Sequence, residues 1–253
     1  MMKRVTMVWL AATLLAGQAA AGIIWEIGRT DLSAREFALH PSGFNDFILG
    51  FGGYDQYYLI GRDQPKKSWP SILPGRSDYW GGNTSWAWRV NFLNAAFYLD
   101  QAPAGKTTLV VATITHNALP APIMWIEVNE QTVIHDFALL DREIKVDIQP
   151  GVLRPGLNIV RLSTRKGSFV IFDSVRLEGP ASFKLGPARN ALVYPPRMSE
   201  FEREKDGGRV QPALVEVVNT VAEAQRLTIE VDGKEITSYA FPRGRSCLEV
   251  PLP

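Results

Sequence analysis

Short apolar runs, interrupted at close intervals by turn-forming residues, dominate the chain after residue 100. Turns such as Asn129-Glu130 and Pro150-Gly151 separate them, as between the short antiparallel strands of a β-sandwich. No long amphipathic helix pattern occurs between Trp25 and Leu177. The pattern therefore predicts an all-β fold. The runs lie at 107–114, 122–128, 143–148, 157–162 and 168–177.

Earlier in the chain, two strands are expected at 23–27 and 57–60. Between them, Asp31 is expected to cap a short helical turn over 33–37, because its carboxylate can accept backbone N–H bonds.

The strand pattern breaks down at 180–212, a stretch with five Pro and a mixed-charge run at 200–206, which predicts a linker. Alternation resumes at 214–218, 226–231, 235–241 and 247–252, with Asp232-Gly233 as a hairpin turn. An immunoglobulin-like sandwich needs about seven strands, so these four indicate a partial domain. Either a longer protein completes it, or its strands pack against the first domain.

The first 21 residues have the features of a secretory signal peptide. Lys3 and Arg4 precede an apolar run at 5–16, and Ala19-Ala20-Ala21 fits the cleavage site before Gly22. The run is too short to span a bilayer, which takes about 20 residues. We therefore expect a secreted or periplasmic protein with four regions: a signal peptide at 1–21, a β-sandwich at 22–179, a linker at 180–212 and a partial β-domain at 213–253.

Composition and charge narrow the classes of partner. The chain is 46% hydrophobic and 21% charged, as expected for a folded protein, and its formal net charge is +1. So small a charge gives no strong attraction to nucleic acid or to an anionic membrane. Cys247 is the single cysteine, which excludes an internal disulfide.

The stretch at 69–92 is unusually aromatic, with four of the seven Trp of the chain. From Ser85 onward apolar and polar residues alternate, which places Trp86 and Trp88 on the core face of a strand. The part at 69–83 contains two Pro and three Gly, so it is not expected to form regular structure.

This irregular part combines aromatic rings with planar polar groups, a combination that suits a sugar: C–H faces stack on rings and hydroxyls form hydrogen bonds. The alternative is that the aromatic side chains cap one end of the sandwich core. The candidate ligand-binding residues are Trp69, Arg76, Asp78, Tyr79, Trp80 and Asn83.

Asp173 interrupts an apolar face. In the alternating run at 169–177, it lies in line with Phe169, Ile171, Val175 and Leu177. A carboxylate there is costly unless it is paired, hydrogen-bonded or bound to a metal. Asp173 is therefore the candidate metal ligand, and the alternative is a bulge at which it accepts backbone or Arg N–H bonds.

No catalytic motif is recognisable. The chain has no G-x-S-x-G elbow, H-E-x-x-H, C-x-x-C or P-loop. His40, His116 and His135 are far apart in sequence, and each is expected to be a surface or hydrogen-bonded histidine and not a ligand, unless the fold gathers them. We therefore name no catalytic residue.

Two groups of residues carry a likeness to a known family, and it covers about residues 23–180. The residues are Trp25-Glu26-Ile27-Gly28, Asp31, Ser33, Glu36, Phe37, Tyr58-Leu59-Ile60-Gly61, Trp69-Pro70, Trp80 and Val90-Asn91-Phe92, with Pro155-Gly156-Leu157-Asn158 and 172–178 at the end. Their pattern resembles the jelly-roll, carbohydrate-binding-like domain of rhamnogalacturonan lyases. It also resembles the β-domain of large secreted bacterial glycosidases, including α-mannosidases. The end of the region is similar to the last strands of galactose-binding-like modules.

In those lyases the catalytic residues lie in a separate domain, so the resemblance implies a noncatalytic accessory module, and at Asp173 it implies a structural calcium. The expected fold is a galactose-binding-like jelly roll followed by a partial immunoglobulin-like domain. The expected partners are a polysaccharide or oligosaccharide and a catalytic domain. Two alternatives remain: the N-terminal piece of a lyase or glycosidase, and a structural β-domain without a ligand.

Overall fold

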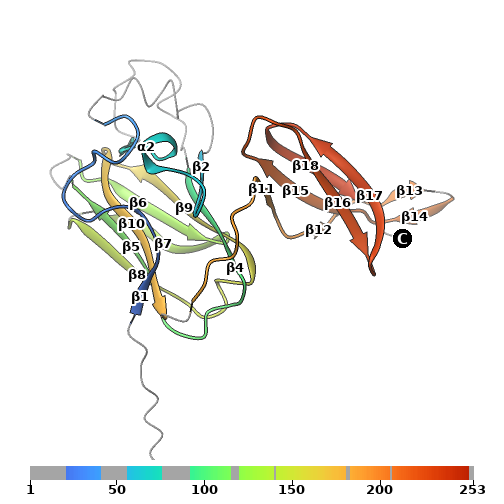
Figure 1. Cartoon of the computed structure of the whole chain (residues 1–253), viewed down its shortest axis with the longest axis horizontal. Helices are drawn as coiled ribbons and strands as arrows, with labels where there is room; N and C mark the ends of the chain where they lie inside the picture. The colour runs from blue at the N-terminus through green and yellow to red at the C-terminus, as the bar shows by residue number, and fades with distance from the viewer. Residues whose placement is uncertain are drawn as a thin grey trace, which may run out of the picture.

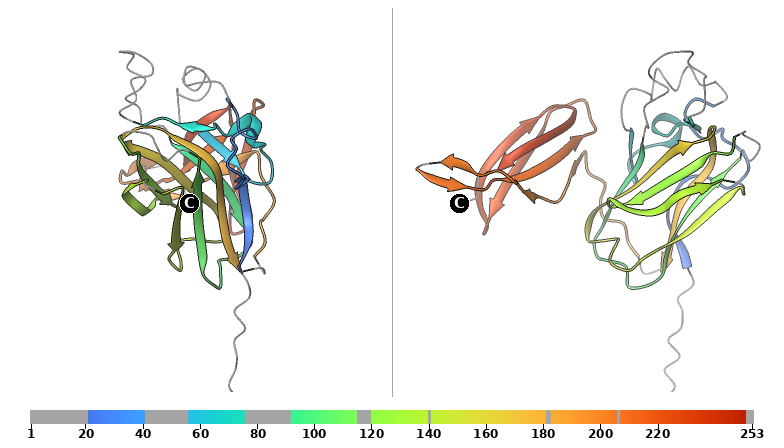
Figure 2. Two further views of the ribbon diagram at one scale, coloured as in Figure 1. Left: turned by 90° about the vertical axis from the view of Figure 1, so that its left-hand side faces the viewer. Right: turned by 180° about the vertical axis from the view of Figure 1, so that it is seen from behind.

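The described part of the chain is an all-β sandwich with further strands beyond it. The computed structural model describes residues 21–40, 56–75, 92–114, 120–139, 141–180, 183–205 and 207–250. Two five-stranded sheets face each other, and the C-terminal strands lie to one side of them (Figure 1). The same arrangement is visible from behind in Figure 2. The all-β prediction is confirmed.

The first sheet contains β1 (Ala21–Gly28), β3 (Ile72–Leu73), β5 (Thr107–Thr113), β8 (Glu143–Ile148) and β10 (Val170–Pro180). Its order is β1-β10-β5-β8, with β3 paired to the start of β10. All of these pairs are antiparallel. The central strand β10 therefore contacts three others and organises the sheet.

The second sheet contains β2 (Gln56–Leu59), β4 (Leu93–Leu99), β6 (Ile123–Val128), β7 (Gln131–Ala138) and β9 (Gly156–Lys166). Its order is β2-β4-β9-β6-β7, and the β2–β4 pair is parallel whereas the others are antiparallel. The inward-facing side chains of both sheets form one core, which includes Trp25, Phe97, Met124, Val160 and Phe172.

Two hairpins show why their turns form where they do. Asn129 and Glu130, between β6 and β7, have φ of +51° and +67°. A two-residue hairpin loop of type I′ needs positive φ at both positions, and Asn tolerates it well. Asp232 and Gly233 have φ of +51° and +76° and join β16 (Gln225–Val231) to β17 (Lys234–Phe241). The predicted Asp-Gly hairpin is confirmed.

Strand β10 does not keep one face throughout, which corrects the expectation of a continuous face at 169–177. Its register with β5 shifts between Phe172 and Ser174, so Asp173 lies at a bulge. Before the bulge Phe172 points into the core, and after it Val175 does. Ile171 therefore faces outward, because an extra residue in a strand reverses the alternation beyond it.

The segment after β1 forms turns and not the expected helical turn over 33–37. Asp31 does accept the Ser33 N–H at 2.9 Å, but Leu32 has φ of +61°, which ends any helical path. The helix found among the described residues is α2 (Pro65–Ser68). No helix in this part of the chain is long and apolar enough to cross a membrane.

Four short strands lie in the stretch expected to be a linker: β11 (Ala191–Val193), β12 (Arg197–Met198), β13 (Arg203–Lys205) and β14 (Gly208–Val210). Strands β11 and β12 pair with β15 (Ala213–Asn219), and β18 (Gly244–Val250) pairs with it as well. Pro195 and Pro196 separate β11 from β12, which is why the sequence reads as irregular there. The hairpin of β16 and β17 packs on this sheet through a second core that includes Val217 and Phe241.

The C-terminal strands contact the outer face of the second sheet. Leu59, Ala96 and Ile159 of that face form an apolar cluster with Leu192 and Val218 from β11 and β15. This contact buries one end of the face and joins the two parts of the chain.

Tyr58 on β2 supports a prediction about alkaline stability. Its ring is buried, and burial together with the charge of Asp63 raises its pKa to about 12. An unfolded Tyr has a pKa near 10, so between about pH 10 and 12 the unfolded state loses this proton first. The free energy of unfolding should therefore be fully present below pH 10 and fall by up to about 2 kcal/mol by pH 12. Urea titrations across this range should show a shallower decline for Tyr58→Phe than for the wild type, and equal slopes would contradict the assignment.

Candidate functional site

A groove of about 1170 Å³ opens at one end of the sandwich, and we call it the end groove. Its lining residues lie after the end of β1 and at the start of β10, two strand ends that can be found in Figure 1. Its walls come from the segment 29–40, from β3, from the end of β5 and from the start of β10. The lining residues are Arg29, Asp31, Leu32, Ser33, Ala34, Arg35, Glu36, His40, Ser71, Ile72, Ile114, Phe169 and Ile171.

The bulge in β10 creates the apolar floor of this groove. Because the alternation reverses at Asp173, Phe169 and Ile171 lie on the opposite face of β10 from Phe172 and pack with Ile72 on β3. Ile171 also contacts the edge of the main core. The backbone oxygen of Ile171 accepts the Ile114 N–H at 2.9 Å. This bond places Ile114, the fourth apolar residue of the floor, beside Ile171. The floor is therefore a consequence of backbone register and not of a local sequence motif.

Backbone hydrogen bonds from the rim hold the segment 29–40 in place. The Asp31 N–H donates to Asp173 Oδ1 at 3.2 Å, and the Arg29 N–H donates to Glu36 Oε1 at 2.9 Å. Ala38 N–H donates to the backbone oxygen of Trp69 at 2.9 Å. The two rim carboxylates of Asp31 and Glu36 thus have structural roles, whereas the guanidinium groups of Arg29 and Arg35 lie at the exposed rim.

Leu32 is strained and exposed at the rim. Its φ is +61° and its side chain is 57% exposed. The left-handed region costs a residue with a Cβ roughly 1–2 kcal/mol, and such strain is concentrated at functional sites. The bonds of Asp31 to Ser33 and Asp173 on either side hold this conformation. The protein therefore keeps an apolar side chain at the mouth of the groove at a cost in stability.

Trp69 is a core residue, which corrects its assignment to an exposed sugar-binding surface. Its side chain is 1% exposed, and its ring makes edge contacts with Tyr58 at 5.8 Å and Phe172 at 5.7 Å between centroids. A ligand cannot reach a ring enclosed in this way. For Trp69 the alternative interpretation, an aromatic cap on the core, is the one that fits the structure.

The remaining predicted ligand-binding residues lie outside the described residues, as do Trp86, Trp88 and His116. Their roles stay predictions. The described part of the chain ends at Gly75 before residues 76–91. Strand β3, which ends two residues before Gly75, contributes Ile72 to the end groove. The residues concerned are Arg76, Asp78, Tyr79, Trp80 and Asn83.

Within the part of the chain that the structure describes, Asp173 belongs to no cluster of metal ligands. It is 1% exposed, lies at the β10 bulge and accepts the Asp31 N–H. Among the described residues, no three His, Cys, Asp or Glu side chains gather in a way that could hold a metal ion. A single carboxylate engaged by a backbone amide does not fit the six to eight oxygen ligands of calcium. The structure matches the alternative, a hydrogen-bonded carboxylate at a bulge.

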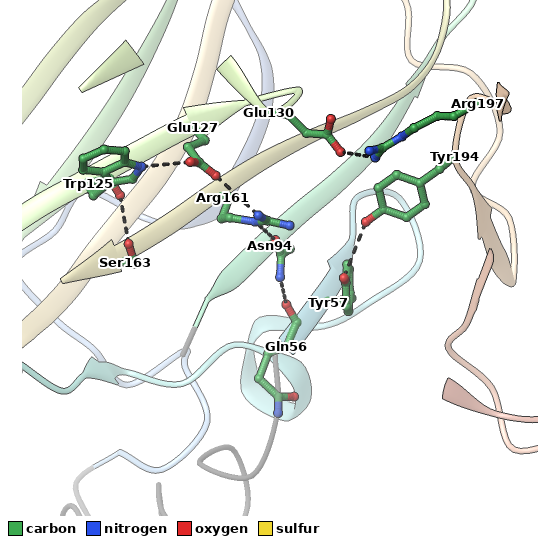
Figure 3. A network of polar contacts seen from close by, with 10 residues as sticks. All are labelled: Gln56, Tyr57, Asn94, Trp125, Glu127, Glu130, Arg161, Ser163, Tyr194 and Arg197. Carbon is green, nitrogen blue, oxygen red and sulfur yellow. Dashed lines mark hydrogen bonds and ion pairs between the residues drawn. The ribbon is translucent and has the colours of Figure 1, made fainter. Parts of the chain in front are cut away.

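A second polar cluster, not anticipated from the sequence, lies on the outer face of the second sheet (Figure 3). Arg161 donates to Asn94 Oδ1 at 3.1 Å and to Glu127 Oε2 at 3.4 Å, and Trp125 Nε1 donates to Glu127 Oε1 at 3.0 Å. Arg165 covers the Trp125 ring at 3.4 Å. These groups satisfy one another across β4, β9 and β6, so the cluster fixes the sheet and offers little to a ligand.

No protein-family model matches the chain, and no curated protein sequence matches it. The resemblance to rhamnogalacturonan lyases and α-mannosidases therefore stays a prediction.

Three solved glycosidase structures show weak similarity. An exo-β-D-glucosaminidase matches with a TM-score of 0.27 and 14% identity, over 63% of this chain and 20% of its own. An exo-chitosanase from Amycolatopsis orientalis matches with a TM-score of 0.27 and 13% identity, over the same shares. A β-glucuronidase from Ruminococcus gnavus matches with a TM-score of 0.28 and 13% identity, over 92% of this chain and 39% of its own. At these scores a common fold is not established, and the chain spans well under half of each enzyme.

Proposed function

We propose that this chain is an exported, noncatalytic accessory module that binds a saccharide in the end groove. The observation that carries the proposal is the combination of an apolar floor with a charged rim in a groove of about 1170 Å³. Small-molecule pockets measure about 300–1000 Å³, so the groove has room for an oligosaccharide. The N-terminal segment with Lys3, Arg4 and the apolar run is the support for export.

The chemistry of the groove suits an uncharged sugar. Phe169 and Ile171 offer the surface on which the C–H face of a pyranose packs, and Arg29 and Arg35 offer hydrogen-bond donors for hydroxyls. The two Arg are balanced by Asp31 and Glu36, so the rim has little net charge. Such a rim gives a neutral ligand no electrostatic penalty.

The proposal contains no catalytic step. Asp31 and Glu36 accept backbone N–H bonds from their own segment, and this accounts for their positions at the rim. Catalysis on the bound saccharide is assigned to a partner catalytic domain, as the resemblance implies.

Leu32→Gly separates binding from stability. Glycine adopts positive φ without strain, which stabilises the folded state, but it also makes the unfolded chain more flexible, which destabilises the folded state. Because the two effects offset each other, the free energy of unfolding should change by less than about 1 kcal/mol. Binding of uncharged mannan oligosaccharides, measured by calorimetry, should weaken severalfold because an apolar contact at the mouth is lost.

Phe201→Ala is the matched control, since Phe201 is also apolar and exposed, at 76%, but lies in the C-terminal part. It should leave binding unchanged. If no oligosaccharide binds the wild-type chain, or if Leu32→Gly binds as tightly as the wild type, saccharide binding in the end groove is wrong and the domain without a ligand is favoured.

A further inference from the structure

A second cavity, of about 380 Å³, lies where the C-terminal strands meet the second sheet, and we call it the junction cavity. It shares no residue with the end groove. Its volume falls within the usual range for a small ligand. The residues that line it are Gln56 and Tyr57 from β2, Val218, Asn219 and Thr220 from the end of β15, and Arg243, Gly244 and Arg245 from the turn into β18.

Direct contacts hold the two walls of the junction cavity together. Arg62 Nη1, just beyond β2, donates to Thr220 Oγ1 at 2.7 Å. The hydroxyls of Tyr57 and Tyr194 are 3.4 Å apart (Figure 3). The apolar cluster around Leu59 and Val218 adds a third contact. Because these bonds span the two parts of the chain, the cavity has a defined width.

The junction cavity carries one uncompensated positive charge. Arg62 is paired with Asp63 at 2.7 Å, and Arg245 Nη2 is paired with Glu216 Oε2 at 2.7 Å. Arg243 makes no ion pair or hydrogen bond with any residue that the structure describes. Burial raises the pKa of Tyr194, so this hydroxyl stays neutral and adds no compensating charge.

Arg245 is pre-oriented for a ligand by its partner. Glu216 holds the guanidinium through one carboxylate oxygen, while its other oxygen, Oε1, is buried and accepts no hydrogen bond. This oxygen is enclosed by protein, so a ligand in the cavity meets the guanidinium groups of Arg243 and Arg245 and not the carboxylate. Two guanidinium groups in the lining favour a ligand with an anionic group.

We infer that the junction cavity binds the carboxylate of an acidic saccharide. The planar Arg243 guanidinium can pair with a carboxylate through two parallel hydrogen bonds. One uncompensated charge matches a monoanion better than phosphate, which carries more than one negative charge near neutral pH. The Tyr57 ring and Val218 provide the apolar wall against which a sugar ring packs.

Calorimetric titration of the full chain at low ionic strength with D-galacturonate, D-galactose and inorganic phosphate tests this inference. Galacturonate should bind weakly, galactose about tenfold more weakly, and phosphate more weakly than galacturonate. Arg243→Gln should weaken galacturonate binding at least about tenfold, or about 1.4 kcal/mol, because it removes the positive charge and breaks the pair of parallel hydrogen bonds. Added salt should weaken it as well.

One control variant locates the site. Arg226→Gln removes an exposed guanidinium on the β16 hairpin, away from both cavities, and should leave galacturonate binding unchanged. An equal loss with Arg226→Gln, or no loss with Arg243→Gln, would overturn the inference. So would absence of galacturonate binding, equal binding of galactose, or tighter binding of phosphate. The oligosaccharide test of the end groove is independent of all these outcomes.

Discussion

Replacing Trp69 with alanine is expected to destabilise the protein by about 3–5 kcal/mol, the usual cost of removing a buried aromatic side chain. The indole is 1% exposed and lies between Tyr58 and Phe172, so the cavity left behind is enclosed by other rings. The backbone oxygen of Trp69 also holds Ala38, at the base of the end groove. Urea denaturation followed by circular dichroism measures the loss.

Trp69→Phe is the matched variant and should cost less than half as much. The Trp69 Nε1 is buried and donates no hydrogen bond within the described structure, so phenylalanine keeps much of the packing and removes an unsatisfied donor. The contrary result would be a Trp69→Ala protein that is as stable as the wild type but no longer binds oligosaccharide. That result would return Trp69 to an exposed binding surface.

The strands were predictable wherever local pattern determines them. The runs at 107–114 and 143–148 became β5 and β8 because each alternates or stays apolar between clear turns. The hairpin at Asp232-Gly233 was predictable because its two residues tolerate positive φ. Strand β7 was missed because it is an edge strand whose side chains are mostly exposed, which removes the apolar signal.

The end groove could not be predicted in the same way. Its floor depends on the bulge at Asp173, and one extra residue reverses which side chains face outward. The sequence marked Asp173 as unusual. It could not show that Ile171, before Asp173, and Val175, after it, lie on opposite faces of β10. Its walls also come from segments more than 130 residues apart in the chain, such as Leu32 and Phe169, and only tertiary pairing brings them together.

The junction cavity escaped prediction for a related reason. Arg243 and Tyr57 have no shared motif, and they meet because β18 pairs with β15 while β15 packs near β2. The stretch at 180–212 was expected to separate the two parts, yet β11 and β12 within it pair with β15. Short strands of two or three residues carry too little periodicity to be recognised.

Gly28→Ala is expected to have the second large effect, because the residue is both conformationally constrained and crowded. Its φ is +83°, and a Cβ would lie 2.6 Å from the backbone oxygen of Asp173 and closer still to the Phe37 ring. Left-handed strain and overpacking together should cost about 3 kcal/mol or more. Relief of the clash must displace Phe37 or the β10 bulge, so the end groove should lose its saccharide affinity as well.

Gly151→Ala isolates the conformational part of this cost. Gly151 has nearly the same φ, +85°, but a Cβ there would meet no atom within 4 Å. Its substitution should cost only about 1 kcal/mol and leave saccharide binding intact. Melting curves and oligosaccharide titrations of the two variants can be compared directly. Equal losses of stability would mean that Gly28 is not crowded, and that the segment 29–40 is not seated on the β10 bulge, which the end groove requires.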